Sequence, residues 1–451
     1  MQFIIAGSQF GYSQLFVIFV SNVIAVILQN QCVKLGVAAN VDLASASKKH
    51  LDWRLNLLLY ILAELAVMAC DLAEVIGSAI ALQLLFGIPL YAGVLITALD
   101  VIIILFCWNA KYFRVFEIGI MIIALAIFIC LAILVAKSNP HWPDVAYGFL
   151  PTKSVFASSD SIMAAVSIVG ATVMPNNLYL HSSLVRYRSS RLARNPEESV
   201  IGSISSTPLI DELESSTESP TVTEERTIKE DIPRSIRMAA IDTISALTFA
   251  LFINASILIV SAANFYTAGI NNVADLSDAY NLLAKFLGNG MAVVFAIGLL
   301  LSGQSSTFTG TLAGQFIMEG FLGSNFNVKP WVRRIVTRLL VIVPALITII
   351  AMGDKGLNDL LVISQVVLSF QLPFAVWPLI YFTCNTKIMS RRYVPNGSSP
   401  VTTSPDPDVA ERQYETHSFA NSNFMTVVCV ICAMIVTVLN MALLVTLFMG
   451  N

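Results

Sequence analysis

The chain carries little charge. Only 12% of its 451 residues are Asp, Glu, Lys or Arg, about half of the ~25% usual in soluble domains, whereas 56% are hydrophobic. This composition excludes an ordinary soluble domain, and no nucleic-acid partner is expected. Apolar segments of about 20 residues, the length that crosses a bilayer, recur from one end of the chain to the other. The sequence therefore predicts an all-α polytopic membrane protein surrounded by lipid.

Pairs of histidines at metal-ligand spacing are also missing from the sequence. The seven cysteines fall mostly within or beside apolar segments, as Cys70 and Cys429 do, so we interpret them as small packing residues. No His-x-x-x-His pattern is present, and the Cys-x-x-Cys spacing of Cys429 and Cys432 falls inside an apolar span. We therefore expect neither an enzyme nor a resident cofactor. No basic residue precedes Lys34, so the first residues lack the charged region of a signal peptide.

Apolar runs read as helices predict about ten transmembrane spans. They lie near residues 10–33, 55–82, 87–108, 114–137, 159–184, 236–264, 289–322, 335–352, 358–383 and 424–448. With the loop after Cys32 in the cytosol, most Lys and Arg residues fall on the cytosolic side. The opposite side receives only Lys137, Lys153, Lys285 and Lys355. This asymmetry follows the positive-inside rule and determines the predicted topology.

The span at 55–82 contains three acidic residues at membrane depth. Glu64, Asp71 and Glu74 follow one another at spacings of seven and three residues, which places them on one helix face. Ionisable groups inside a membrane are costly and mark functional sites by default. The pattern favours a proton or cation path over a purely structural network. Arg338, four residues after Arg334 at the start of a later span, is expected to form an ion pair with Asp71 or Glu74.

The stretch GATVMPNNLYLHSS (170–183) interrupts another span. Pro175 has no N–H and clashes with the preceding turn, so the helix must kink or unwind there. Freed carbonyl groups near Ala171 would be hard ligands, whereas the Met174 thioether would be a soft one. Such a site favours transition metals over Ca²⁺ and Mg²⁺. The alternative is that Met174 only fills space.

Two further spans are rich in small and polar residues. LSGQSSTFTGTLAGQFIMEGF (301–321) carries hydroxyl groups, and SQVVLSFQLPFAVWPL (364–379) carries Gln365 and Gln371. These side chains are typical either of a polar path or of hydrogen bonds between helices.

Together these segments resemble the Nramp family of proton-coupled divalent metal transporters. The matching stretches also include AGSQFGYSQLFVIFVSN, LAELAVMACDLAEVIG, GIPLYAGVLITALDV and RRIVTRLL, and they cover nearly the whole chain. The resemblance implies a LeuT-like fold of two inverted five-helix repeats with broken helices. It implies that Mn²⁺ or Fe²⁺ and protons cross a plasma, endosomal or vacuolar membrane. It implies metal ligands at Ala171, Met174 and Gln365. It implies a proton pathway through Glu64, Asp71, Glu74, His181, Arg334 and Arg338.

The family pattern also divides the chain. Residues 1–185 would hold family helices 2–5 and the broken sixth helix, and residues 236–383 would hold helices 7–10. Residues 186–235 and 384–423, rich in Ser, Thr and charged residues, would be cytosolic loops, the first of them disordered. Residues 424–451 would add a C-terminal helix.

The sequence departs from the family pattern in two places. The Asp-Pro-Gly-Asn motif of the family's first helix is not found, so that helix is expected to be missing. The family's Met-Pro-His reads Met174-Pro175-Asn176 here, and Asn cannot titrate as His does. Two alternatives stay open. One is a truncated membrane protein that does not transport and is inactive or modulates a full-length partner. The other is a carrier of organic substrates with a LeuT-like fold.

Overall fold

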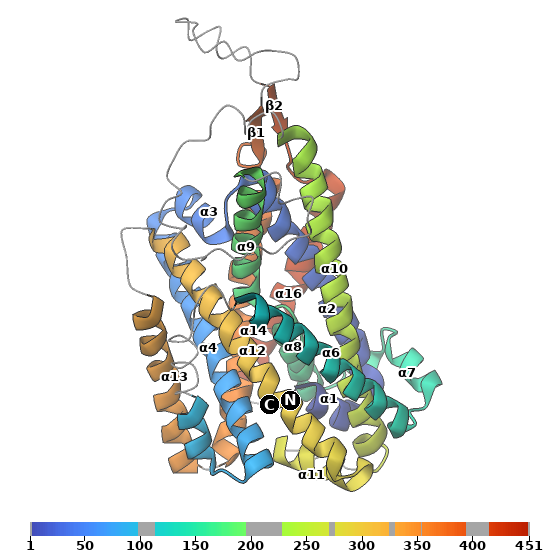
Figure 1. Ribbon diagram of the computed structural model, residues 1–451. Helices are drawn as coiled ribbons and strands as arrows, with labels where there is room; N and C mark the ends of the chain where they lie inside the picture. Colours follow the sequence, from blue (N-terminus) through green and yellow to red (C-terminus); the bar gives the residue numbers. More distant parts are fainter. Residues whose placement is uncertain are drawn as a thin grey trace, which may run out of the picture.

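The computed structural model describes residues 2–97, 113–194, 228–269, 276–323, 330–352, 354–393 and 415–449. These residues are mostly helical, and the long helices run between the two ends of the molecule (Figure 1). The elements of the first half are α1 (Gln2–Phe10), η1 (Gly11–Gln14), α2 (Leu15–Lys34), η2 (Leu35–Ala39), α3 (Leu43–His50), α4 (Trp53–Phe86), α6 (Phe113–Ser138), α7 (Trp142–Gly148), η4 (Lys153–Phe156), α8 (Ser159–Thr172) and α9 (Pro175–Arg194). Residues 90–97 are also helical.

The second half continues in the same way and adds a short β-ladder. Its elements are α10 (Ile228–Ser261), η6 (Ala262–Tyr266), α11 (Leu276–Leu287), α12 (Asn289–Leu322), α13 (Pro330–Met352), α14 (Asp354–Cys384), β1 (Ser390–Tyr393), β2 (Glu415–Ser418) and α16 (Asn423–Met449). The two strands pair antiparallel, with Ser390 opposite Ser418 and Tyr393 opposite Glu415.

Seven helical segments of the described residues are long and apolar enough to cross a membrane. They are Gln2–Ala39, Trp53–Phe86, Ser159–Tyr187, Ile232–Tyr266, Asn289–Leu322, Ile363–Cys384 and Asn423–Val445. Shorter apolar helices at Ala124–Ser138 and Val336–Ala351 coincide with two more predicted spans. The predicted span at 87–108 lies partly outside the described residues.

The helices extend beyond the predicted spans at several ends. Residues 186–194 continue α9, and residues 228–235 belong to α10, so both ends of the predicted disordered loop 186–235 are helical. Residues 195–227 lie outside the described part of the chain. The predicted loop 384–423 contains the β1–β2 ladder. At the other end, α1 precedes the first predicted span. Gly11, at φ +59°, separates α1 from α2 through a conformation that favours glycine.

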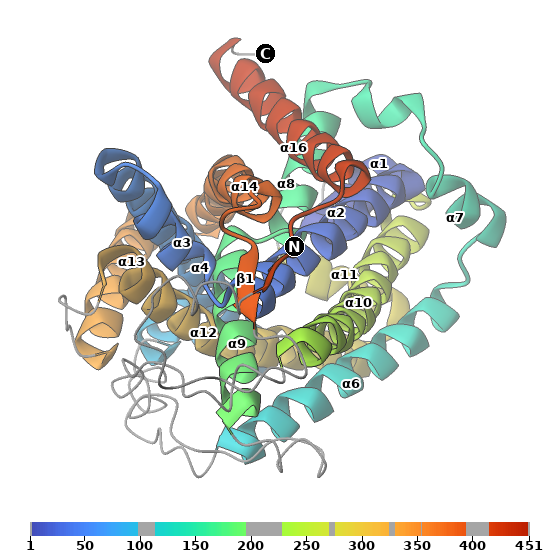
Figure 2. The ribbon, with the colours of Figure 1, turned by 90° about the horizontal axis from the view of Figure 1, so that it is seen from above.

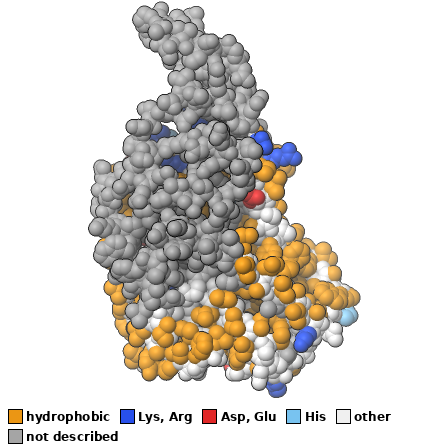
Figure 3. Space-filling model, viewed as in Figure 1, with side chains coloured by type: hydrophobic (Ala, Val, Ile, Leu, Met, Phe, Trp, Pro, Cys, Tyr) orange, Lys and Arg blue, Asp and Glu red, His pale blue; other side chains and the backbone are white. Residues whose placement is uncertain are grey.

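The outward face of α13 shows what surrounds the bundle. Six of its large apolar side chains are at least half exposed: Val336, Leu339, Leu340, Val343, Ile347 and Ile350. They recur every three or four residues, while Arg338 and Ala345 on the opposite face are buried. Hydrophobic side chains also cover much of the lower part of the molecule in Figure 3. An apolar outer face with a charged inner face suits a lipid environment.

Polar contacts connect α3 to α9 at the end of the bundle that lies uppermost in Figure 1. Asp42 caps α3 by accepting a hydrogen bond from the Ser45 N–H at 2.8 Å, and its other carboxylate oxygen lies 2.6 Å from Arg186 Nη1 on α9. The Leu43 N–H donates to Ser182 Oγ, also on α9, at 3.1 Å. Seen from above, α9 lies between α12 and α10 (Figure 2). We call the Asp42–Arg186 and Leu43–Ser182 contacts the α3–α9 clamp.

Candidate metal and proton site

The predicted helix break is present between α8 and α9. Ser158 caps α8 by accepting from the Ser161 N–H at 3.2 Å, and the helix ends at Thr172. Val173 has φ −103° and ψ 76°, which is not helical, and α9 begins at Pro175. Pro175 stands four residues after Ala171 and has no N–H for the Ala171 carbonyl. The break therefore frees this carbonyl from the helix ladder.

Close packing brings the break against α14. A Cβ atom at Gly170 would lie 2.9 Å from Ser369 Cβ and 3.2 Å from the Gln365 carbonyl oxygen. Only a glycine lets the two backbones approach this closely. Ala171 and Met174 are consequently held beside the turn of α14 that carries Gln365.

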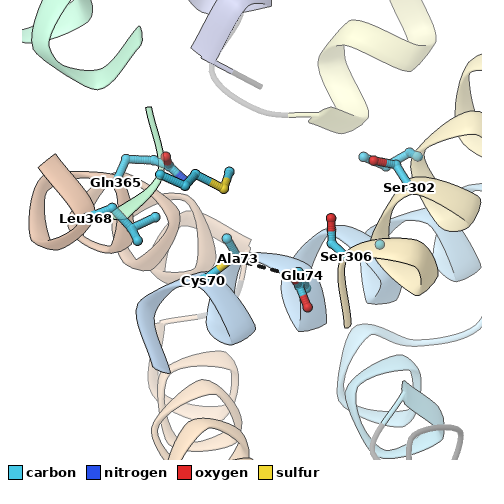
Figure 4. A pocket seen from close by; sticks show the side chains of 11 residues that line it. Cys70, Ala73, Glu74, Ser302, Ser306, Gln365 and Leu368 are labelled. Carbon is cyan, nitrogen blue, oxygen red and sulfur yellow. Dashed lines mark hydrogen bonds between the residues drawn. The ribbon is translucent and has the colours of Figure 1, made fainter. Parts of the chain in front are cut away.

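A cavity of about 150 Å³ lies at this junction. Its polar and sulfur-bearing walls come from four segments: α4, the break before α9, α12 and α14 (Figure 4). They are Cys70, Glu74, Met174, Ser302, Ser306 and Gln365. A water molecule occupies about 30 Å³ of liquid, so the volume accommodates a cation with a few waters. The cavity thus joins two predicted metal ligands with one acid of the predicted proton pathway.

The side-chain carbonyl oxygen of Gln365 is suited to a cation. This Oε1 atom is buried and accepts no hydrogen bond from any described residue. An amide oxygen left without a donor costs free energy unless something else binds it. A hydrated or partly dehydrated cation in the adjoining cavity would satisfy it.

Next to the cavity, a buried ion pair connects α4 and α13. Asp71 is 0% exposed and Arg338 is 5% exposed, and Arg338 Nη1 lies 4.0 Å from Asp71 Oδ1. Arg338 Nη2 also donates to the Thr97 carbonyl oxygen at 3.5 Å. The predicted pairing of Arg338 with Asp71 is therefore confirmed. The opposite charges reduce the cost of placing each group at membrane depth.

Gly310 of α12 covers the two acids. A Cβ atom there would lie 3.3 Å from Asp71 Oδ1 and 3.9 Å from Glu74 Oε1. One glycine therefore faces both carboxylates. Glu74 lines the cavity and Asp71 contacts Arg338, so a continuous row of ionisable groups runs from the cavity to α13.

The other predicted pathway residues lie apart from the cavity lining. His181 Nε2 lies 3.2 Å from Thr243 Oγ1, which joins α9 to α10. Glu64 is half-buried on α4 and does not line the cavity. Arg334 belongs to α13, but its side chain is outside the described part of the structure.

Three polar or sulfur-bearing residues of the cavity wall were not predicted as part of the site. Ser302 and Ser306 stand four apart on α12, within the hydroxyl-rich stretch for which the sequence left a polar path open. Cys70 was interpreted as packing, yet it lines the cavity one turn before Glu74. Its spacing of four residues from Glu74 is the signal that could have found it.

Similarities to known proteins agree with this arrangement. The model of the family described as natural resistance-associated macrophage protein-like matches residues 3–398. The chain is 46% identical over 387 residues to the divalent metal cation transporter MntH of a Nostoc species, covering 86% of this chain and 79% of the relative. It is 41% identical over 445 residues to the MntH of Brucella suis, covering 98% and 83%.

Solved structures extend the similarity to the fold. A manganese transporter of Eremococcus coleocola superimposes with a TM-score of 0.76 at 30% identity, covering 100% of this chain and 84% of the other. A nucleobase-cation-symport-1 family transporter matches 84% of this chain with a TM-score of 0.52 at 17% identity, which shows a shared fold alone. The predicted LeuT-like helical fold is thereby confirmed. The chain therefore belongs to the Nramp family, and is an integral membrane protein of a transporter family rather than an enzyme family.

Proposed function

We propose that this chain carries divalent transition metal ions, Mn²⁺ and Fe²⁺ among them, across a membrane together with protons. The observation that carries the proposal is the shared cavity, where the Met174 thioether, the Gln365 side chain and the Glu74 carboxylate meet. The names of the relatives support the metal part, since proteins 46% identical to this chain are divalent metal cation transporters.

The donors around the cavity suit a transition metal. Met174 supplies a polarisable sulfur, and Gln365 supplies a buried oxygen that accepts no hydrogen bond from the described residues. Pro175 frees the Ala171 carbonyl at the same break. Ca²⁺ and Mg²⁺ use oxygen ligands, whereas a thioether contributes to binding softer cations. Glu74 provides negative charge to offset that of the cation.

The row of acids supports proton coupling. Glu74 faces the cavity, Asp71 lies three residues earlier on the same helix face, and Arg338 forms an ion pair with Asp71. A cation entering the cavity repels a proton on Glu74, because like charges at short range in a low dielectric interact strongly. Asp71 offers that proton an acceptor away from the metal, and Arg338, which stays protonated, stabilises the ionised Asp71 carboxylate. Glu64 and His181 would continue the route on α4 and α9.

Uptake by purified protein tests the proposal. In proteoliposomes with an inward proton gradient, the parent chain should take up Mn²⁺ saturably and acidify the interior as it does so. Met174→Ala removes the thioether and should weaken the inhibition of Mn²⁺ uptake by Cd²⁺ while strengthening inhibition by Ca²⁺. An internal pH dye and a Mn²⁺-quenched dye report both fluxes.

Asp71→Asn is the variant for the proton part. The Asn side chain keeps the shape of Asp but cannot take up and release a proton. Mn²⁺ uptake should therefore lose its accompanying acidification. Acidification equal to that of the parent would make the acids structural. Absence of saturable Mn²⁺ uptake by the parent would overturn the metal part and favour a membrane protein that does not transport.

A further inference from the structure

A thiol lines the same cavity as the proposed metal ligands. Cys70 is 6% exposed and stands one turn before Glu74 on α4. Its Sγ donates a hydrogen bond to Glu74 Oε1 at 3.4 Å, drawn as a dashed line in Figure 4. The Asn176 side chain lies close to the same thiol group. The hydrogen bond to Glu74 holds this sulfur at the wall, which distinguishes it from a cysteine that only fills apolar space.

Asn176 itself is fixed by the helix break. Its Oδ1 accepts a hydrogen bond from the Asn177 N–H at 3.0 Å, and the residue is 3% exposed. The Cys70 sulfur therefore lies beside the first turn of α9 as well as on α4.

The two sulfur-bearing residues of the site are neighbours. Met174 packs against the cluster of Ala66, Ala69, Cys70 and Leu368, and both Met174 and Cys70 line the cavity. A cation in about 150 Å³ therefore has two sulfurs within the same small space, together with the Gln365 oxygen and the Glu74 carboxylate. Sulfur atoms select soft cations, and the Cys70 sulfur is a second such atom beside the Met174 thioether.

We propose that the Cys70 sulfur is a second soft contact for the transported ion, beside Met174, and that it shifts selectivity toward thiophilic divalent cations such as Cd²⁺. This inference rests on the proposed transport function, because it concerns the same cavity. It makes Cys70 a specificity-determining residue, and Glu74 the residue that positions its sulfur.

Competition in proteoliposomes tests the inference. Mn²⁺ uptake is measured against increasing Cd²⁺ for the parent, for Cys70→Ser and for Cys432→Ser. Cys432 is the matched control, since it is 5% exposed on α16 and does not line the cavity. For Cys70→Ser the Cd²⁺ concentration that halves uptake should rise at least about tenfold, the lower end of the effect of losing a group around a metal site. The Cys432→Ser chain should match the parent.

The outcomes separate this inference from the function it rests on. No Mn²⁺ uptake by the parent overturns the proposed function. Uptake by the parent with equal Cd²⁺ inhibition in Cys70→Ser overturns only the role of Cys70.

A second measurement needs no variant. Methyl methanethiosulfonate modification of the purified parent chain is followed at each cysteine by mass spectrometry. Cd²⁺ should slow modification of Cys70, and Ca²⁺ should not, while Cys432 reacts alike in all samples. Modification of Cys70 at the same rate with and without Cd²⁺ would overturn the inference even if Cys70→Ser did not fold.

Discussion

Glycine at position 303 permits the closest approach between α12 and α4. A Cβ atom there would overlap Ser78 Oγ, and Ser78 is 2% exposed, so the hydroxyl has little space to withdraw into. Gly77, also on the cavity wall, is different, because its added Cβ would lie 3.8 Å from the nearest atom, Leu299 Cδ1, an ordinary contact. Two glycines that line one cavity therefore have different roles.

Gly303→Ala should destabilise the protein by about 1–3 kcal/mol through overpacking. Ser78→Ala in the same chain removes the overlapping hydroxyl and should restore most of the loss, a coupling that a double-mutant cycle measures. Thermal unfolding in detergent, followed by tryptophan fluorescence, gives the comparison. Gly77→Ala is the control and should be neutral or slightly stabilising, since alanine favours a helix. Equal losses for both glycines would show that the Ser78 contact does not decide the effect.

Residue chemistry explains which parts of the site could be predicted from the sequence. Pro175 cannot donate a backbone hydrogen bond in any context, so the freed Ala171 carbonyl follows from the sequence alone. The Asp71–Arg338 pair follows because a buried charge needs a partner and few cations lie at membrane depth. The spacing of Cys70 from Glu74 places both on one helix face, but the sequence could not predict that this face lines a cavity, since that depends on how α4 is rotated against its neighbours. The contact between His181 and Thr243 could not be predicted either, because it depends on how α9 is rotated against α10.

At the scale of elements, the α3–α9 clamp connects a short helix to the helix that starts at the proposed metal site. Arg186 and Asp42 form its ion pair, with side chains 42% and 6% exposed. Lys48, on the same α3, instead donates to the Leu322 carbonyl oxygen at the end of α12. The short helix therefore contacts two long helices through different side chains.

Arg186→Gln should loosen α9 while leaving α12 in place. Because Arg186 is partly exposed, its ion pair with Asp42 contributes about 1 kcal/mol to stability, the upper end for such pairs. Hydrogen exchange of peptides from α3 and from the part of α9 around Arg186 should then be about fivefold faster, since exchange follows the local opening equilibrium. Lys48→Gln is the matched control and should affect only the end of α12. Unchanged exchange in α9 would mean that the Leu43–Ser182 hydrogen bond alone holds the two helices together.

Helix ends were the least predictable elements. The apolar pattern stops where the membrane stops, whereas α9 continues through polar residues to Arg194 and α10 begins at Ile228. The β1–β2 ladder gives no pattern strong enough to predict, because each strand has only four residues. The bilayer-spanning parts were predictable because their length and polarity are set by the lipid and not by a neighbouring helix.

For the whole molecule, the prediction concerns orientation in the membrane. Lys153 and Lys387 are both exposed, and the positive-inside rule places them on opposite sides. In intact cells a membrane-impermeant thiol reagent should label Lys153→Cys and should label Lys387→Cys only after permeabilisation. Labelling of the parent chain, which has only the native cysteines, gives the background signal. The reverse pattern would invert the topology, and with it the direction of the proposed transport.

The β1–β2 ladder offers a place to insert a reporter of this orientation in living cells. Its register places Tyr393 directly opposite Glu415, so the two strand ends lie side by side. A fluorescent domain whose own termini are close together can be spliced between these residues without pulling the strands apart. A pH-sensitive domain placed there would report whether the proposed proton flux reaches this face of the protein. The two-stranded sheet thus offers a fixed attachment point for an optical sensor.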